Sequence, residues 1–167
     1  MKRLPKEVYT EVVRNTPLVS IDLIIEDTEG NILLGYRLNN PAKHTWFVPG
    51  GVIRKNEPFV EAFQRISEAE LGFKIQLNEA VFIGVYEHIY PTNFAELESF
   101  GTHYIVNAFH LKLNKKTIEL PKQQHSEYWW ANKQELLAHE KVHSNTKNYF
   151  NGYKAFSSFN KENDNKF

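Results

Sequence analysis

Hydrophobic and polar residues repeat with two different periods along the chain, and the period changes at turn residues. Val8, Val12 and Val13 recur at helical spacing and stop before Pro17, which predicts a short amphipathic helix. Other stretches alternate with a period of two or are β-branched, as in strands. The predicted elements are helices over 6–15, 56–71, 132–137 and 145–156 and strands over 18–25, 32–38, 46–48, 73–90, 102–113 and 128–130.

The glycines of the first half mark two places where the backbone needs unusual freedom. Glu29-Gly30-Asn31 separates two apolar stretches and predicts a hairpin. Gly50-Gly51 follows a short strand and indicates either special dihedral angles or close approach by another group. Asn56 as an N-cap and Gly72 as a C-cap delimit the helix that follows.

The composition is that of a folded protein without a net charge. The chain has 167 residues, with 20 Lys and Arg against 20 Asp and Glu, and 41% of its residues are hydrophobic. We expect a single domain over 1–159 and a frayed polar tail over 160–167. Balanced charge disfavours binding of nucleic acid through its phosphates, and no apolar stretch has the length of a membrane span. With no cysteine, a metal would need oxygen or imidazole ligands.

Glu70 is the first residue whose position suggests chemistry. At helical spacing it lies on the same side as Phe59, Phe63 and Ile66, so a carboxylate projects from an apolar stripe. A buried carboxylate needs a compensating charge, which a divalent cation or an arginine provides. A structural salt bridge to Arg65 or Arg37 is the plainer alternative.

The stretch from Gly51 to Phe73 is Gly-x5-Glu-x7-Arg-Ile-x3-Glu-x-Gly-Phe, and it resembles the signature of the Nudix hydrolases. The resemblance implies a mixed α/β fold in which a central mixed sheet lies between helices. Ile66 replaces the glutamate that follows the arginine in that signature, and Ala69 replaces the first member of its Glu-Glu pair. This departure is similar to the GDP-mannose mannosyl hydrolases, also called GDP-mannose glycosidases.

Further segments extend that resemblance over most of the chain, from about residue 8 to residue 150. They are Leu18-Val-Ser-Ile-Asp22, Leu34-Gly-Tyr-Arg37, Asn40-Pro-Ala42, Trp46-Phe-Val-Pro-Gly-Gly51, Tyr86-Glu-His88, Thr102-His-Tyr104, Gln124-His125 and Val142-His-Ser-Asn145.

The resemblance implies one Mg²⁺ per subunit, with Mn²⁺ as a substitute, bound by the Gly50 carbonyl, Glu70 and Gln124. Oxygen ligands of this kind suit Mg²⁺. His125 would be the general base, a role that also fits the ordinary titration of histidine near neutral pH. His103, His110 and His139 are expected on strands or at the surface.

The same resemblance places the remaining residues on the substrate. Arg37 would bind the diphosphate, and Asp22, His88 and Tyr104 would contact the sugar or the leaving phosphate. Tyr9 would stack on guanine, although packing against the core is an equal alternative. Arg65 is also expected to bind the substrate. The family has an arginine at the position of Val52. Either Arg54 takes its place on the diphosphate, or this chain binds phosphate more weakly.

The reaction expected from this resemblance is Mg²⁺-dependent hydrolysis of GDP-mannose or GDP-glucose. Water would attack the anomeric carbon and give GDP and a free sugar of inverted configuration. One alternative is a pyrophosphohydrolase that cleaves a nucleoside diphosphate sugar at phosphorus, and another is a nucleotide-sugar binding module without catalysis. A cytoplasmic homodimer is also expected, with the N-terminal helix and the 91–101 loop as candidate contacts.

Overall fold

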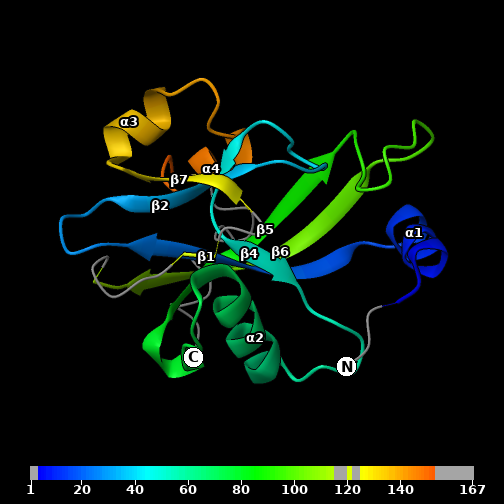
Figure 1. The fold of residues 1–167 in the computed structure, drawn as a ribbon, viewed down its shortest axis with the longest axis horizontal. Helices are drawn as coiled ribbons and strands as arrows, with labels where there is room; N and C mark the ends of the chain where they lie inside the picture. The colour runs from blue at the N-terminus through cyan, green and yellow to red at the C-terminus, as the bar shows by residue number, and fades with distance from the viewer. Residues whose placement is uncertain (1–3, 115–119, 122–124, 153–167) are drawn as a thin grey trace, which may run out of the picture.

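The computed structural model describes residues 4–114, 120–121 and 125–152, and at residues 125 and 126 it describes the backbone alone. Within this part of the chain, seven strands form one mixed sheet with helices on both faces (Figure 1). The predicted fold class is therefore confirmed. The elements are α1 (Lys6–Asn15), β1 (Leu18–Glu26), β2 (Ile32–Arg37), β3 (Trp46–Phe47), β4 (Gly50–Val52), α2 (Phe59–Leu71), the 3-10 helix η1 (Leu77–Glu79), β5 (Val81–Tyr90), β6 (Thr102–Lys112), β7 (His125–Ala131), α3 (Lys133–Ala138) and α4 (Ser144–Asn148).

Strand β1 lies at the centre of the sheet and has different partners along its two edges. On one edge it pairs in parallel with β6, in a register that begins at Leu18 and Tyr104 and ends at Glu26 and Lys112. β6 pairs in turn with β5 in an antiparallel arrangement. On the other edge β1 pairs with β2 through Glu26 and with β4 through residues 20–22.

The predicted hairpin of β1 and β2 forms at its turn, and then its strands separate. β2 continues against β3 on one edge and β7 on the other, whereas β1 continues against β4. The chain from Trp46 to Val52 thus fills the fork between the two hairpin strands. This fork places the double glycine beside the middle of β1.

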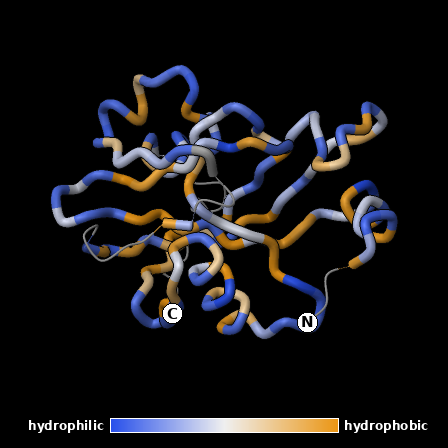
Figure 2. The backbone as a smooth tube through the Cα atoms, viewed as in Figure 1, coloured by the Kyte–Doolittle hydropathy of each residue, from blue (hydrophilic) through white to orange (hydrophobic). Residues whose placement is uncertain are grey.

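Two hydrophobic clusters hold the helices on the sheet. α2 packs on one face through Phe63, Ile66 and Leu71, which are at most 1% exposed. α3 and the segment leading through α4 cover the other face, where Leu136 and Val142 are buried (Figure 1). In Figure 2 the hydrophobic stretches follow the strands, and the turns at the periphery are mostly hydrophilic.

The structure corrects four details of the predicted elements. β4 was not predicted as a strand, and the predicted strand over 73–90 begins only at Val81, because a capping box between Gln76 and Glu79 starts η1. α2 begins at Phe59 with Pro58 as its N-cap, whereas Asn56 lies in a left-handed turn with φ 60°. The last predicted helix is shorter and ends at Asn148. The tail over 160–167 lies outside the described residues.

Candidate active site

The first glycine of the pair lies directly beside a buried acid. Gly50 and Asp22 are register partners in the β1–β4 pair. A Cβ atom on Gly50 would be 2.5 Å from Asp22 Oδ1 and 2.7 Å from the carbonyl oxygen of Ile21. Only glycine fits this approach, so the sequence motif is explained by contact with Asp22, which is 7% exposed.

Asp22 is an acid whose surroundings favour its neutral form. Burial raises the pKa of Asp22 to about 7, and the negative charge of Glu70 contributes to the rise, whereas Tyr149 and Arg37 act in the opposite direction. Glu70 itself is 4% exposed, as the helical spacing predicted. The structure therefore brings two buried carboxylates into electrostatic contact across the sheet.

Glu70 and the backbone carbonyl of Gly50 fit a hard divalent cation. Mutual repulsion of buried acids is relieved by a cation, and carboxylate and carbonyl oxygens are the ligands that Mg²⁺ accepts. No cluster of three or more His, Asp or Glu side chains with metal-binding geometry occurs among the described residues. A site here needs a backbone carbonyl or an amide as well. Gln124, the predicted amide ligand, lies outside the described residues.

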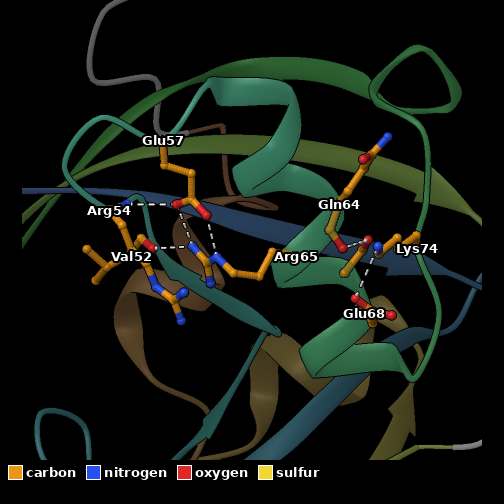
Figure 3. Close-up of polar contacts among 8 residues, drawn as sticks. Val52, Arg54, Glu57, Gln64, Arg65, Glu68 and Lys74 are labelled. Atoms are coloured by element: carbon orange, nitrogen blue, oxygen red, sulfur yellow. Dashed lines mark hydrogen bonds and ion pairs between the residues drawn. The ribbon is translucent and has the colours of Figure 1, made fainter. Parts of the chain in front are cut away.

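Arg65 binds Glu57 and leaves Glu70 to other neighbours. Its guanidinium donates to Glu57 at 2.6 and 2.8 Å and to the Val52 carbonyl at 2.9 Å, so it lies between these two groups (Figure 3). Glu57 also accepts a hydrogen bond from the Arg54 backbone at 2.8 Å. Arg65 chiefly lowers the pKa of Glu57, to about 2. This ion pair fixes the loop between β4 and α2, and with it the backbone that presents Arg54.

A group of polar side chains from β5 and the end of α4 surrounds Asp22. The hydroxyl of Tyr149 donates to Asp22 Oδ2 at 2.7 Å and lies 3.4 Å from His88 Nε2. Burial, with a smaller effect of His143, lowers the pKa of His88 to about 4, so this imidazole is neutral at physiological pH. Asp22 and His88, both predicted site residues, are therefore joined through a tyrosine that the sequence did not indicate.

Arg37 faces this group from the end of β2. Its Nε donates to the Pro41 carbonyl at 3.0 Å, which fixes the guanidinium at the loop that follows β2. The positive charge of Arg37 lowers the pKa of Asp22 and, after burial, that of His143. An arginine held in this way is half-buried and oriented, unlike an ordinary surface arginine on a hairpin.

His125 begins β7, where its backbone is the register partner of Arg37. The predicted general base thus lies beside the predicted diphosphate-binding residue in the sheet. Its side chain is not described, so its role stays a prediction. The other histidines agree with expectation: His103 contacts Glu87 at 3.1 Å, His110 contacts Glu26 at 2.7 Å and His139 stacks on Trp129.

Tyr9 and Tyr104 lie at the far end of the site, next to α1. Tyr9 packs against Phe94 of the 91–101 loop in a tilted arrangement, with 4.9 Å between ring centroids. Burial raises the pKa of Tyr104, and Tyr9 adds to the rise, which indicates that the two phenols are close. α1 and the 91–101 loop, predicted as candidate dimer contacts, thus pack on each other within one chain. This arrangement fits both alternatives for Tyr9, core packing and stacking on a base.

His143 and Tyr90 are further members of the site that sequence reasoning missed. His143 Nδ1 accepts from the Asn145 backbone at 3.1 Å, so its Nε2 carries the proton when the ring is neutral. Its ring packs against Phe47 and Tyr90, with centroids 5.4 and 5.3 Å away. The Val142-His-Ser-Asn145 segment was a signal for His143, whereas no sequence signal distinguished Tyr90 from other strand tyrosines.

Together, the fold and the site define a Nudix-fold hydrolase, in which a helix carboxylate faces a double-glycine strand. Comparison with known proteins gives the same result, because the NUDIX domain matches residues 16–151. The chain belongs to the Nudix hydrolase family, whose members act on small molecules and generally use divalent metals. None of the helices in the described part of the chain has the length and apolar character to cross a bilayer.

Two kinds of relatives are similar to this chain. The low-salt glycan biosynthesis protein Agl8 of Haloferax volcanii is 40% identical over 126 residues, which are 75% of this chain and 77% of Agl8. A MutT Nudix hydrolase of Burkholderia pseudomallei has a TM-score of 0.63 at 25% identity, covering 80% of this chain and 95% of the other. A MutT protein of Methanosarcina mazei has the same TM-score at 20% identity, over 81% of this chain and 92% of that protein.

Proposed function

We propose that this chain is a Mg²⁺-dependent hydrolase of GDP-sugars that releases GDP and free mannose or glucose by attack of water at the anomeric carbon. The observation that carries the proposal is the reduced set of acids on α2. Ile66 occupies the place of a metal-binding glutamate and packs on Gly51, where a Cβ atom would be 3.2 Å from its Cγ1. Ala69 lies exposed where a second glutamate is usual.

A site with fewer acids is better suited to binding the leaving group than to assembling several metal ions for attack at phosphorus. Glu70, the Gly50 carbonyl and Gln124 would hold one Mg²⁺, or Mn²⁺ in its place. When bound, the ion supplies charge neutralisation to the diphosphate. Arg37, fixed by the Pro41 carbonyl, would hold the same diphosphate through its remaining donors.

The other predicted residues act on the sugar and the water. His125 would accept the proton of the attacking water, and a bound GDP is a good enough leaving group that no general acid is needed at the bridging oxygen. Asp22, His88 and Tyr104 would lie toward the sugar and the leaving phosphate, and Tyr9 would stack on guanine. Arg54 and Arg65 would support the diphosphate, Arg65 through the loop that it fixes.

The relative Agl8 supports a role in nucleotide-sugar metabolism, because its name places it in glycan biosynthesis. Such a role is consistent with a cytoplasmic enzyme, and we propose that the enzyme acts as a homodimer. GDP-sugar levels control the supply of sugar units for surface glycans, so a hydrolase of GDP-mannose would limit that supply.

Hydrolysis of GDP-mannose with Mg²⁺ in ¹⁸O-labelled water tests the proposal. We expect the label in the free sugar and none in GDP, which shows attack at carbon. Label in a phosphate product would show attack at phosphorus, as in a pyrophosphohydrolase, and would overturn the proposed reaction. Tight binding of GDP-mannose without turnover would instead identify a binding module.

A further inference from the structure

Tyr149 connects two of the predicted site residues from a distant part of the chain. Its hydroxyl is 2.7 Å from Asp22 Oδ2 and 3.4 Å from His88 Nε2, and it lies directly after α4. Its ring is held by an edge-on contact with Tyr86, at 4.7 Å between centroids. The hydroxyl therefore has a fixed place between the carboxylate and the imidazole.

The protons available on Tyr149, Asp22 and His88 determine which group donates in each of these two hydrogen bonds. A phenol has one proton, and the short contact assigns that proton to Asp22 Oδ2. Burial and the charge of Asp22 raise the pKa of Tyr149 far above its usual value, so the hydroxyl stays protonated. The phenol oxygen can then only accept from His88, which requires the proton of the neutral imidazole to be on Nε2.

The two oxygens of Asp22 consequently have different surroundings. Oδ2 is bound by Tyr149, whereas Oδ1 lies against the backbone of Gly50. His88 is 2% exposed and Asp22 is 7% exposed, so both side chains are shielded from solvent. The chain of contacts runs from His88 through Tyr149 to Asp22, and its free end is the Asp22 oxygen beside the double glycine.

We infer that Tyr149 is a positioning residue: its hydroxyl fixes the orientation of the Asp22 carboxylate, with Oδ1 beside Gly50, and holds His88 in the Nε2–H tautomer. This role deepens the proposed function and rests on it for the substrate, a GDP-sugar. The placement of the three side chains relative to one another does not depend on that substrate. Tyr149 touches neither the sugar nor the diphosphate in this role.

Tyr149→Phe removes the hydroxyl and retains the ring that packs on Tyr86. With GDP-mannose and Mg²⁺, we expect kcat to fall about 10- to 100-fold, because the buried hydrogen bond that orients the Asp22 carboxyl group is lost. KM should stay within about threefold, because the groups proposed to bind GDP are unchanged. Tyr86→Phe is the matched control, since it removes a hydroxyl from the neighbouring ring, and it should retain wild-type kcat. Equal kcat in wild type and Tyr149→Phe would overturn the inference.

Long-range ¹H–¹⁵N NMR of the histidine rings tests the same inference without turnover. In the wild-type protein His88 should show the Nε2–H tautomer, and Tyr149→Phe should shift its ring signals toward a mixture. His139, at the end of α3 and in a tilted contact with Trp129, serves as the internal reference and should not change. An Nδ1–H tautomer of His88 in the wild type, or an unchanged His88 in the variant, would overturn the positioning role even if GDP-mannose proved not to be the substrate.

Discussion

The carboxylate of Glu57 and the guanidinium of Arg65 form a two-point ion pair between the loop before α2 and the middle of that helix. The Glu57 side chain is 6% exposed and that of Arg65 is 28% exposed, so the pair is mostly shielded from water. The sequence had left Arg65 as one possible salt-bridge partner of Glu70. The structure pairs Arg65 of α2 with Glu57, and this pair fixes the loop that follows the double glycine.

Glu57→Gln should destabilise the protein at neutral pH. The pKa of Glu57 is lowered from 4.5 to about 2, so its contribution is present above pH 4.5 and is lost as pH falls toward 2. We expect a decrease in the free energy of unfolding on the order of 3 kcal/mol at pH 7. Urea denaturation at pH 7 and pH 3 measures it, and the difference from wild type should shrink at pH 3.

Glu68→Gln is the matched control for this charge removal. Glu68 lies on the same helix and forms an exposed pair with Lys74 at 3.7 Å (Figure 3). An exposed pair contributes at most about 1 kcal/mol. If Glu57→Gln were no more destabilising than Glu68→Gln, the Glu57–Arg65 pair would not be the element that stabilises the loop.

Gly50→Ala should abolish most of the activity and destabilise the fold. The added methyl group would be 2.5 Å from Asp22 Oδ1 and 2.7 Å from a backbone oxygen, so the strand or the carboxylate must move. Gly51→Ala meets only the flexible Ile66 side chain, at 3.2 Å, and should be milder in both respects. Thermal denaturation and GDP-mannose turnover compare the two variants. Equal effects would show that the close approach to Asp22 is not what requires glycine.

Asp22→Asn should lose activity and gain stability relative to wild type as pH rises. Folding raises the pKa of Asp22 from 3.8 to about 7. Between pH 3.8 and pH 7, the free energy of unfolding therefore decreases by about 1.4 kcal/mol per pH unit. Asparagine has no charge to bury, so the variant avoids this loss. Denaturation in the presence of a chelator at pH 4 and pH 8 measures the difference. If the two proteins differed in free energy of unfolding by the same amount at both pH values, ionisation of Asp22 would not destabilise the folded state.

Glu70→Gln should weaken Mg²⁺ binding and raise the Mg²⁺ concentration needed for half-maximal activity. An amide in place of a carboxylate removes a full negative charge from the site that repels Asp22. The same change should lower the pKa of Asp22, because Glu70 contributes to its rise. Titration of activity with Mg²⁺ tests the ligand assignment, which an unchanged metal requirement would contradict.

His125→Gln should reduce turnover by about 10²- to 10⁴-fold, the usual share of a general base. Binding of Mg²⁺, measured directly by calorimetry, should remain close to that of the wild type. His103→Gln is the control, because His103 contacts Glu87 on the β5–β6 pair and has no proposed role in catalysis. Retention of full activity by His125→Gln would remove it from the mechanism.

The sequence predicted those elements that are determined by the spacing and capping of neighbouring residues. Helical spacing predicted α1 and the burial of Glu70, and Asn132 caps α3 as expected, because its side chain accepts from the Glu135 backbone at 2.9 Å. β4 was missed because its strand character comes from β1, a partner far along the chain, and not from its own residues.

The sequence named part of the candidate site but not the contacts between distant segments. Asp22, Arg37 and His88, which the family resemblance named, lie near one another in the structure, and their roles stay predictions. Tyr149 was not predicted, because its contact with Asp22 spans 127 positions and arises from the packing of α4 on the sheet. No local period or spacing encodes such a contact.

The parallel pairing of β1 with β6 also determines when the enzyme can assemble during synthesis. The central strand ends at Glu26, whereas its parallel partner begins only at Thr102, and Tyr149 lies further along the chain. Contacts between residues so far apart in sequence form slowly. The nascent chain must therefore keep one edge of its central strand unpaired until β6 has been made, and the candidate site becomes complete only after α4 and Tyr149 follow.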